Sequence, residues 1–509
     1  MATQLSLPVV SGAHPAVIST APAAMRKTRA STVYEAGSTG TRRALAWRAP
    51  TTSPNQAALQ QLTTLRDRAR LAVRNDGWAK GIIDTLVKNI IGTGIKPLSK
   101  ATDPALRVAL QALWARWTEH SDADRRRDFY GQQSLAVRCW LEAGEVFVRL
   151  RPRLPEDGLP VPLQVQILEP EMVPHDYNGT AKGTGNKIRA GLEFDRIGRT
   201  VAYYVYASRP GELDDWDVGD LRRIPAASMI HVYDELRAGQ LRGLPHLTQA
   251  LIRLHELDKF EDAVLLRSQI ANLFAGFIEQ PAGLGGSTVN ALTGAEEDTD
   301  SLGRELASLE PGIMQALAPG EKVTFNDPPN SDPFGAAFME QQLRGAAVAA
   351  GTPYEILTGN LSGLNDRVMR VVLHEFRRGI MARQHQIVAH QLCRRVWNAW
   401  LDRIYVTGAL SLPFAPASPE GAAAIAGVKW MPQGWPYLHP VQDVTSAQAS
   451  IKAGFTSRQA VVAEQGEDSE VIDAEQAEDN RRAQDLGLAY ESGTQAAPAA
   501  AAPAPGEAA

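Results

Sequence analysis

Apolar residues between positions 332 and 405 recur at helical spacing on both sides of a short loop rich in small residues. The first helix is expected over residues 332–351, where Asp332-Pro333 supplies an N-cap and a first-turn proline. Its apolar stripe consists of Met339, Leu343, Ala346 and Ala350. A second helical pattern runs without proline from Asp366 to Tyr405. Residues 352–365 are therefore expected to form a loop that the two helices present to a partner.

The chain before this stretch combines helical and alternating patterns. Helices are expected at 57–73, 79–91, 106–117 and 134–142, and strands at 146–150, 163–168, 191–195, 201–207 and 229–233. Asp195 to Gly198 suits a hairpin turn between two of these strands. The expected fold class is α+β, mainly helical, with long helices and a small antiparallel sheet.

The remaining segments differ in composition. A long helix is expected over 245–278. It is followed by a loop-and-strand module over 279–331, with strands at 313–317 and 322–325. The region over 408–492 begins with a Pro/Ala-rich stretch and is expected to contain one helix at 444–453 and another at its acidic end. Residues 1–55 are rich in small residues and proline and carry several arginines, which predicts a disordered basic arm. Residues 493–509 are an Ala/Pro tail that composition predicts to be disordered.

Composition narrows the class of protein. No run approaches eighteen consecutive apolar residues, so no membrane span is expected, and the N-terminus lacks the pattern of a secretory signal. The two cysteines, Cys139 and Cys393, lie in apolar helical contexts and are interpreted as free buried thiols in a reducing compartment. The net charge is −5, with acidic residues gathered at 464–479. Proteins that hold DNA phosphates tightly are usually basic, so tight binding of DNA is not predicted.

Motifs of catalysis and metal binding were sought and none was found. There is no phosphate-binding G-x-x-x-x-G-K-[ST] sequence, and Ser362 lies between glycines without the spacing of a nucleophile elbow. The histidines of the second helix, His374, His385 and His390, lack the i, i+4 spacing of a zinc pair. Asp122-x-Asp124, beside three arginines, is better explained as a charge cluster or a subunit contact than as a Mg²⁺ site. No catalytic residue, metal or cofactor is therefore predicted, and the chain is not expected to be an enzyme.

Several short runs together resemble the lambda-like portal protein family of tailed bacteriophages, and they occur in family order from about residue 60 to residue 490. They are Arg74-Asn75, 91–97, 143–147 (Ala-Gly-Glu-Val-Phe), 168–171, 224–232, 239–245 (Gly-Gln-Leu-Arg-Gly-Leu-Pro), 317–321, 351–359, 430–440 and 454–457. Each run alone is weak, and their combination is specific.

The resemblance implies a dodecameric ring at one capsid vertex, through which double-stranded DNA is packaged and ejected. Mapped by order, it implies a wing at 56–244, stem helices at 245–278 and 332–351, a clip at 279–331, a tunnel loop at 352–365, a wing-to-crown helix at 366–407 and a crown at 408–492. It also implies contacts with the terminase large subunit, with head-completion and tail connector proteins, and with major capsid and scaffold proteins. The expected location is the virion, after assembly in the host cytoplasm.

The loop supplies the candidate DNA-facing residues Asn360, Ser362, Asn365 and Arg367. The positions that match family motifs are Pro353, Thr358, Gly359, Arg370, Gln240, Arg242 and Gly243. Family members often have Asn-Tyr-Ser-Ser-x-Arg after the loop, whereas this chain has Asp366-Arg367-Val368 in the middle of that run. An alternative for Asp366 and Arg367 is a helix N-cap and a first-turn residue. The alternatives for the whole chain are a capsid or head-tail protein without a DNA channel, and a hydrolase that uses Ser362 or the histidines.

Overall fold

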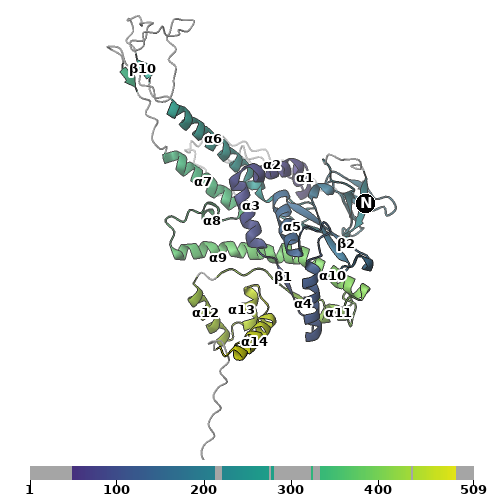
Figure 1. Ribbon diagram of the computed structural model, residues 1–509. Helices are drawn as coiled ribbons and strands as arrows, with labels where there is room; N and C mark the ends of the chain where they lie inside the picture. The colour runs from purple at the N-terminus through teal and green to yellow at the C-terminus, as the bar shows by residue number, and fades with distance from the viewer. Residues whose placement is uncertain are drawn as a thin grey trace, which may run out of the picture. The chain divides into compact units, whose positions relative to one another are not determined.

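A computed structural model describes residues 49–211, 220–273, 277–279, 322–324, 333–436 and 439–488. The chain divides into two compact units, Met1–Ser53 and Pro54–Ala509, and the elements described below belong to the second (Figure 1). Nearly all of the predicted arm, most of the 279–331 module and the predicted tail lie outside the described residues, as does the strand expected at 313–317.

Helices make up the first part of this unit. They are α1 (Pro54–Leu59), α2 (Leu62–Asn75), α3 (Gly77–Ile90), α4 (Pro104–Thr118) and α5 (Phe129–Ala143). Aspartates fix where three of them begin, because Asp76, Asp103 and Asp128 each accept hydrogen bonds from first-turn N–H groups. α5 consequently begins at Phe129, five residues before the expected start. It ends at Gly144, whose φ of 91° is the left-handed conformation of a helix C-terminus.

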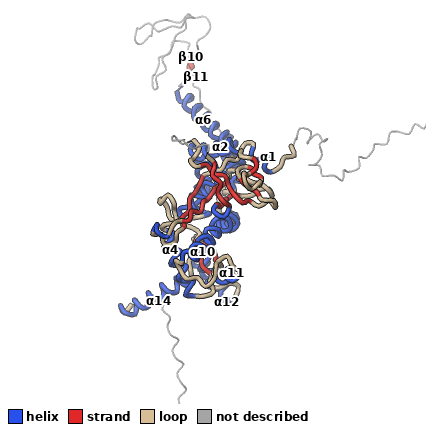
Figure 2. The backbone as a smooth tube through the Cα atoms, turned by 90° about the vertical axis from the view of Figure 1, so that its right-hand side faces the viewer, coloured by secondary structure: helices blue, strands red, loops and turns tan. Residues whose placement is uncertain are grey.

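Two antiparallel sheets follow. One has the order β3-β2-β9, with β2 (Glu145–Pro152) between β3 (Leu163–Leu168) and β9 (Met229–Tyr233). The other has the order β4-β5-β6-β7-β8, with strands Gly179–Thr180, Lys187–Arg189, Leu192–Phe194, Thr200–Tyr206 and Leu221–Pro225. The predicted hairpin turn is confirmed, since the Gly198 N–H donates to the Asp195 carbonyl at 3.1 Å. The two sheets pack against each other (Figure 2), with Phe147 and Met229 of the first in one buried cluster with Tyr203 and Ile224 of the second.

Short elements connect these sheets to the rest of the chain. 3₁₀ turns span Pro155–Asp157, Pro170–Met172, Ala226–Ser228 and His246–Gln249. Strand β1 (Lys96–Ser99) pairs with β12 (Val428–Met431), and β10 (Phe277–Glu279) pairs with β11 (Lys322–Thr324). The sequence patterns had indicated only β11 among these four strands.

The long helices are largely the predicted ones, but the helix expected over 245–278 begins only at Leu251, after the 3₁₀ turn His246–Gln249, and residues 277–278 belong to β10. α6 (Leu251–Leu273) and α7 (Pro333–Ala350) lie side by side (Figure 1), with the rings of Phe260 and Phe338 5.2 Å apart. After α8 (Tyr354–Thr358), the predicted helical run from Asp366 is confirmed as α9 (Asp366–Arg383), a π-helix (Gln384–Cys393) and α10 (Arg394–Thr407). The C-terminal part contains α11 (Pro419–Ala424), α12 (Pro440–Lys452), α13 (Arg458–Glu464) and α14 (Ser469–Leu486).

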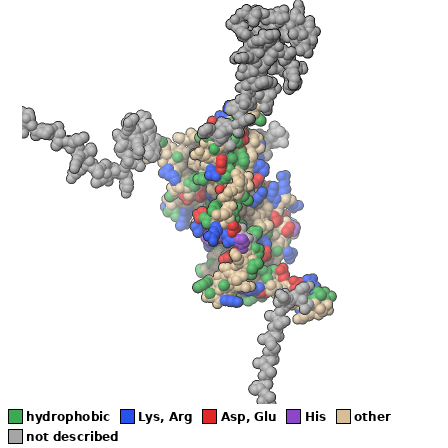
Figure 3. Space-filling view, turned by 90° about the vertical axis from the view of Figure 1, so that its left-hand side faces the viewer, with side chains coloured by type: hydrophobic (Ala, Val, Ile, Leu, Met, Phe, Trp, Pro, Cys, Tyr) green, Lys and Arg blue, Asp and Glu red, His purple; other side chains and the backbone are tan. Residues whose placement is uncertain are grey.

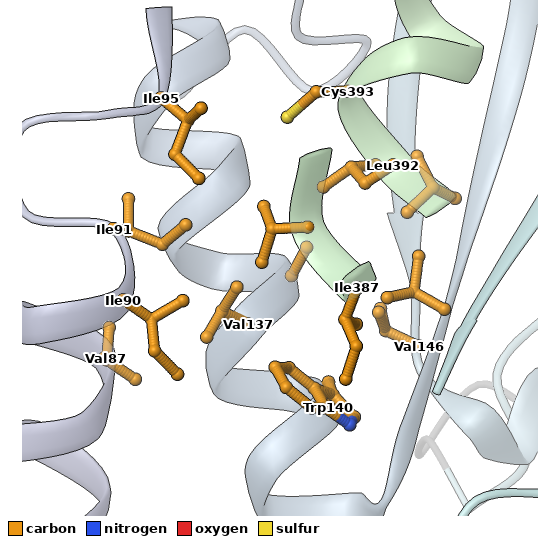
Figure 4. Close-up of a cluster of buried hydrophobic side chains, with 14 of the residues drawn as sticks. Val87, Ile90, Ile91, Ile95, Val137, Trp140, Val146, Ile387, Leu392 and Cys393 are labelled. Atoms are coloured by element: carbon orange, nitrogen blue, oxygen red, sulfur yellow. The ribbon is translucent and has the colours of Figure 1, made fainter. Parts of the chain in front are cut away.

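The main core joins helices from both halves of the chain. Figure 4 shows Ile90 of α3 and Trp140 of α5 facing Ile387 and Leu392 of the π-helix, with Val146 of β2 beside them. Next to them, the indole rings of Trp114 and Trp397 lie 5.0 Å apart. The predicted fold class is confirmed as mainly helical α+β with small antiparallel sheets. Among the described residues, no helix is long and apolar enough to cross a membrane.

Candidate functional site

The predicted loop at 352–365 contains a short helix and a turn. Pro353 precedes α8, and Gly359, at φ +69°, ends it. Thr358 stabilises the end of α8, because its hydroxyl donates to the Tyr354 carbonyl at 2.9 Å and accepts from the Asn360 N–H at 3.2 Å. The exposed part of the predicted loop is therefore the turn at 359–365, which we call the α8–α9 turn.

Three of the four candidate DNA-facing residues organise this turn. The Asn360 side-chain oxygen accepts from the Ser362 N–H at 3.1 Å and from the Ser362 hydroxyl at 2.5 Å. The Asn365 side chain accepts from the Val368 N–H at 2.9 Å and so caps α9. The alternative interpretation placed this cap at Asp366, one residue too late. These polar side chains are exposed, but each already has a local structural role.

Two arginines follow the α8–α9 turn, and one of them, Arg367, is exposed and has no described partner. Arg370 Nε lies 3.2 Å from Asp366 Oδ2, in an orientation that forms an ion pair and not a hydrogen bond. Arg367 is exposed and makes no hydrogen bond or ion pair with any described residue. Figure 3 views the molecule from the side of Figure 1 on which this turn lies, and basic, acidic and apolar side chains are interspersed there. The visible surface is therefore not a continuous basic field.

The family-matched Arg242 and Gly243 meet at a buried carboxylate at the start of β2. Glu145, the first residue of β2, is 0% exposed. Its oxygens accept from Arg242 Nε at 2.6 Å, from the Gly243 N–H at 2.9 Å and from His231 Nε2 at 2.8 Å, and they also pair with Arg66. We call these five residues the Glu145 network.

Backbone contacts lock the same segment in place. The remaining nitrogens of Arg242 donate to the carbonyls of Val173, Ala190 and Pro170 at 3.0, 2.9 and 3.2 Å. The Gln240 side chain donates to the Arg242 carbonyl at 2.8 Å. Gly243 lies against Gly144 so closely that a Cβ on either glycine would come within 3 Å of the other's backbone or its immediate neighbour's. Only glycine fits at these two positions.

Electrostatics keep the network charged at Glu145 and neutral at His231. Burial by itself would raise the pKa of Glu145, but the Arg242 and Arg66 guanidiniums and the bond from His231 hold it well below its ordinary value. Burial lowers the pKa of His231 in spite of the neighbouring carboxylate. Since the carboxylate can only accept, the neutral imidazole must carry its proton on Nε2.

Arg66 and His231 were not identified as site residues from the sequence. The amphipathic pattern of α2 suggested that its arginines face away from the apolar side, yet Arg66 is 2% exposed. A signal was present, because Arg66 continues the helical spacing of Leu62, Ala69 and Val73. A charged residue inside an apolar stripe indicates a buried ionic partner.

The other candidate chemistry does not converge on a site. Within the described residues, no group of three His, Cys, Asp or Glu side chains could hold a metal ion, and Ser362 bonds only to Asn360. His385 and His390 line an open groove of about 650 Å³ together with Arg394, away from His374. The Asp122 carboxylate is occupied by backbone N–H groups and by the Gln132 amide. Both cysteines are free thiols, as expected, and burial raises the pKa of Cys139 to about 12.

Comparison with known proteins identifies the family. The model of the family described as phage portal protein, lambda family, matches residues 40–384, which include the α8–α9 turn and the whole Glu145 network. Because this match spans more than half of the chain, the protein belongs to the lambda family of phage portal proteins.

Two portal proteins of other phages agree with that assignment. A probable portal protein of Halomonas phage phiHAP-1 is 26% identical over 444 residues, covering 84% of this chain and 81% of that protein. Portal protein B of Escherichia phage lambda is 23% identical over 487 residues, covering 88% and 90%. A chain in the solved neck of an empty GTA particle aligns with a TM-score of 0.46 and 14% identity, over 84% of this chain and 98% of that one.

The function expected from the sequence is thereby confirmed at the level of the family. The protein is a phage portal protein and a component of the virion. The family match favours this function over a capsid or head-tail protein without a channel.

Proposed function

We propose that copies of this chain close into a ring, expected to be dodecameric, in which α6 and α7 form the stem. The observation that carries the proposal is the apolar surface of these two helices. Every residue of α6 from Asp262 to Gln269 is exposed. Large apolar side chains on the two helices are between 41% and 81% exposed: Ile252, Val264, Leu265, Leu266, Phe338 and Val348. Neighbouring copies would remove this surface from water.

We further propose that DNA passes the α8–α9 turn without being held tightly. The net charge of −5 and the mixed charges in Figure 3 support a surface that lets a polyanion slide, because a continuous basic lining would bind phosphates strongly. Asn360, Ser362 and Asn365 give the turn a fixed polar surface. Arg367 is the residue free to contact a phosphate.

The partners and the remaining regions are assigned by family analogy. In this proposal the terminase large subunit docks during packaging, head-completion and tail connector proteins dock afterwards, and major capsid and scaffold proteins surround the ring. The role is structural and not enzymatic, and assembly takes place in the host cytoplasm. The wing is 56–244, the clip 279–331, the wing-to-crown helix 366–407 and the crown 408–492.

Electron microscopy of the purified protein tests the ring. Val348→Asp places a charge on a valine of α7 that is 81% exposed, and we expect it to reduce closed rings with an axial hole. Val108→Asp on α4, at a valine that is 64% exposed, is the matched control and should assemble normally. Wild-type protein that stays monomeric, or equal assembly of both variants, would refute the assignment.

Substitution of Arg367 tests the DNA contact. Arg367→Ala should leave ring assembly intact and alter DNA retention or packaging. Arg378→Ala is the control from the same helix, since Arg378 is also exposed but pairs with Glu375 at 3.0 Å. Loss of rings in Arg367→Ala, or the same packaging phenotype in both variants, counts against the assignment.

A further inference from the structure

We propose that Glu145 is a positioning residue that sets the placement of the stem helices from within the wing. The inference rests on the proposed role of α6 and α7 as the stem. It arises from where the partners of this carboxylate lie. Glu145 begins the central strand of the three-stranded sheet, whereas Arg242 and Gly243 belong to the segment that leads into α6.

The segment that connects Glu145's partner Gly243 to α6 is short, and buried side chains hold it in place. Gly243 is two residues from Pro245, which starts the 3₁₀ turn His246–Gln249 that runs directly into α6. Within this turn and just after it, Leu247 and Ala250 are 0% exposed. A connection held by these buried side chains and by the 3₁₀ turn cannot absorb a displacement of Gly243. The displacement is therefore expected to shift the N-terminus of α6.

The same path continues into the second helix. His246 Nε2 lies 2.7 Å from the carbonyl of Ala350, the last residue of α7. The next residue, Gly351, leads through the buried Thr352 to α8 and to the α8–α9 turn. The Glu145 carboxylate is thus connected through Gly243 and His246 to the N-terminus of α6 and to the C-terminus of α7.

Two carboxylates of the described wing residues bond this segment: Glu145, which bonds Arg242 and Gly243, and the exposed Glu235, which accepts only from the Gly239 N–H at 2.7 Å. The other groups that bond it are neutral. The Asn55 side chain donates to the Gly239 carbonyl and accepts from the Leu241 N–H, each at 2.8 Å, and the Tyr233 hydroxyl donates to the Gln240 carbonyl at 2.8 Å. Loss of the carboxylate would deprive Arg242 of its charge partner and weaken the acceptor of the Gly243 N–H. Beyond Leu241 the neutral contacts from other elements go to the Arg242 side chain, which donates to the carbonyls of Val173, Ala190 and Pro170. Among the described residues, the Gly243 N–H itself is bonded by Glu145.

Glu145→Gln and Glu193→Gln form a matched pair for the test. Both replace a 0% exposed carboxylate that binds arginine, but Glu193 lies in the five-stranded sheet, where it bonds Arg223, Tyr204 and Asn186. Hydrogen exchange is measured on the full chain, together with the fraction of closed rings seen by electron microscopy. Glu145→Gln should speed exchange about tenfold or more in α6 and α7. Glu193→Gln should speed exchange only in β5 to β8.

The outcomes separate this inference from the proposed stem function. Faster exchange in α6 and α7 with fewer rings supports both. Faster exchange with a normal ring fraction supports the positioning role and overturns the assignment of these helices to the ring contact. Exchange changes confined to the wing in Glu145→Gln overturn the inference. If Glu145→Gln does not fold, Glu145→Asp applies the same test, because it keeps the charge but withdraws the carboxylate from Arg242 and from the Gly243 N–H, with a smaller expected change and the same refuting result.

Discussion

Replacing Gly243 by alanine tests the close approach on which the Glu145 network depends. A Cβ at Gly243 would lie 2.0 Å from the Gly144 carbonyl oxygen, 2.6 Å from the Gly144 carbonyl carbon and 2.9 Å from Tyr233 Cβ. Side-chain rotation cannot relieve the first two contacts, because both atoms are backbone. The two segments would have to separate by about 1.4 Å or more to bring the first contact to an ordinary distance of 3.4 Å. The Gly243 N–H would then move away from Glu145, which it contacts at 2.9 Å.

The expected loss of stability has two parts. Overpacking of a rigid interior typically costs about 1–3 kcal/mol. A hydrogen bond to a charged acceptor contributes about 1.5–3 kcal/mol, and part of it is lost when the N–H moves. The two parts overlap because one displacement causes both. We therefore expect Gly243→Ala to lower the free energy of unfolding by about 3 kcal/mol.

Urea denaturation followed by tryptophan fluorescence measures this loss, with Gly379→Ala as the control. Gly379 lies inside α9 with open space where a Cβ would stand, so alanine should stabilise the helix by about 0.5–1 kcal/mol. The same chemical change is thus predicted to act with opposite signs at the two positions. A Gly243→Ala protein as stable as the wild type, or destabilisation by both changes, would refute the reasoning.

Two further predictions concern acid and the cap of α9. Because the folded protein lowers the pKa of His231 below about 6.5, the unfolded chain binds more protons as the pH falls below that value, and stability decreases. Stability decreases further below about pH 4.5, because the pKa of Glu145 is also lowered in the folded protein. A series of denaturation experiments between pH 7 and pH 4 measures both effects. Constant stability over this range would contradict both assignments. Asn365→Ala should cost about 1 kcal/mol and speed hydrogen exchange in the first turn of α9, and unchanged exchange there would disprove the cap.

The parts of the fold that the sequence predicted are those with a long or regular apolar period. Strands Leu163–Leu168 and Met229–Tyr233 have the predicted bounds, because the first alternates apolar and polar residues and the second is a short run rich in strand-forming residues. The run from Asp366 was predicted as helix, but no pattern distinguishes its π-helical middle from α-helix. β1 was missed because four residues that include a proline carry no period, and its partner β12 is distant in sequence. α8 was missed because it is a single turn defined by Pro353 and Gly359.

The sequence named some residues of the α8–α9 turn and of the Glu145 network as site residues, but not Glu145, Arg66 or His231, and it did not indicate the geometry. Asn360 and Asn365 were chosen as loop residues, and their turn and cap contacts follow from the local preferences of asparagine. Arg242 and Gly243 came from a family motif, yet nothing in the sequence indicates that they meet Glu145, which lies 97 and 98 residues away. Arg66 shows that a single charged residue inside an apolar stripe indicates half of a buried ion pair.

The pairing of β1 with β12 has a consequence for synthesis on the ribosome. Beside these strands, the Thr93 N–H bonds to the side chain of Gln433, 340 residues further along the chain. At about 5–20 residues per second, translation needs on the order of tens of seconds to supply that partner. During this interval the early helices lack the strand that completes one side of their core. A nascent chain therefore cannot finish folding, or offer a finished surface to its sister copies, until nearly all of it has been made.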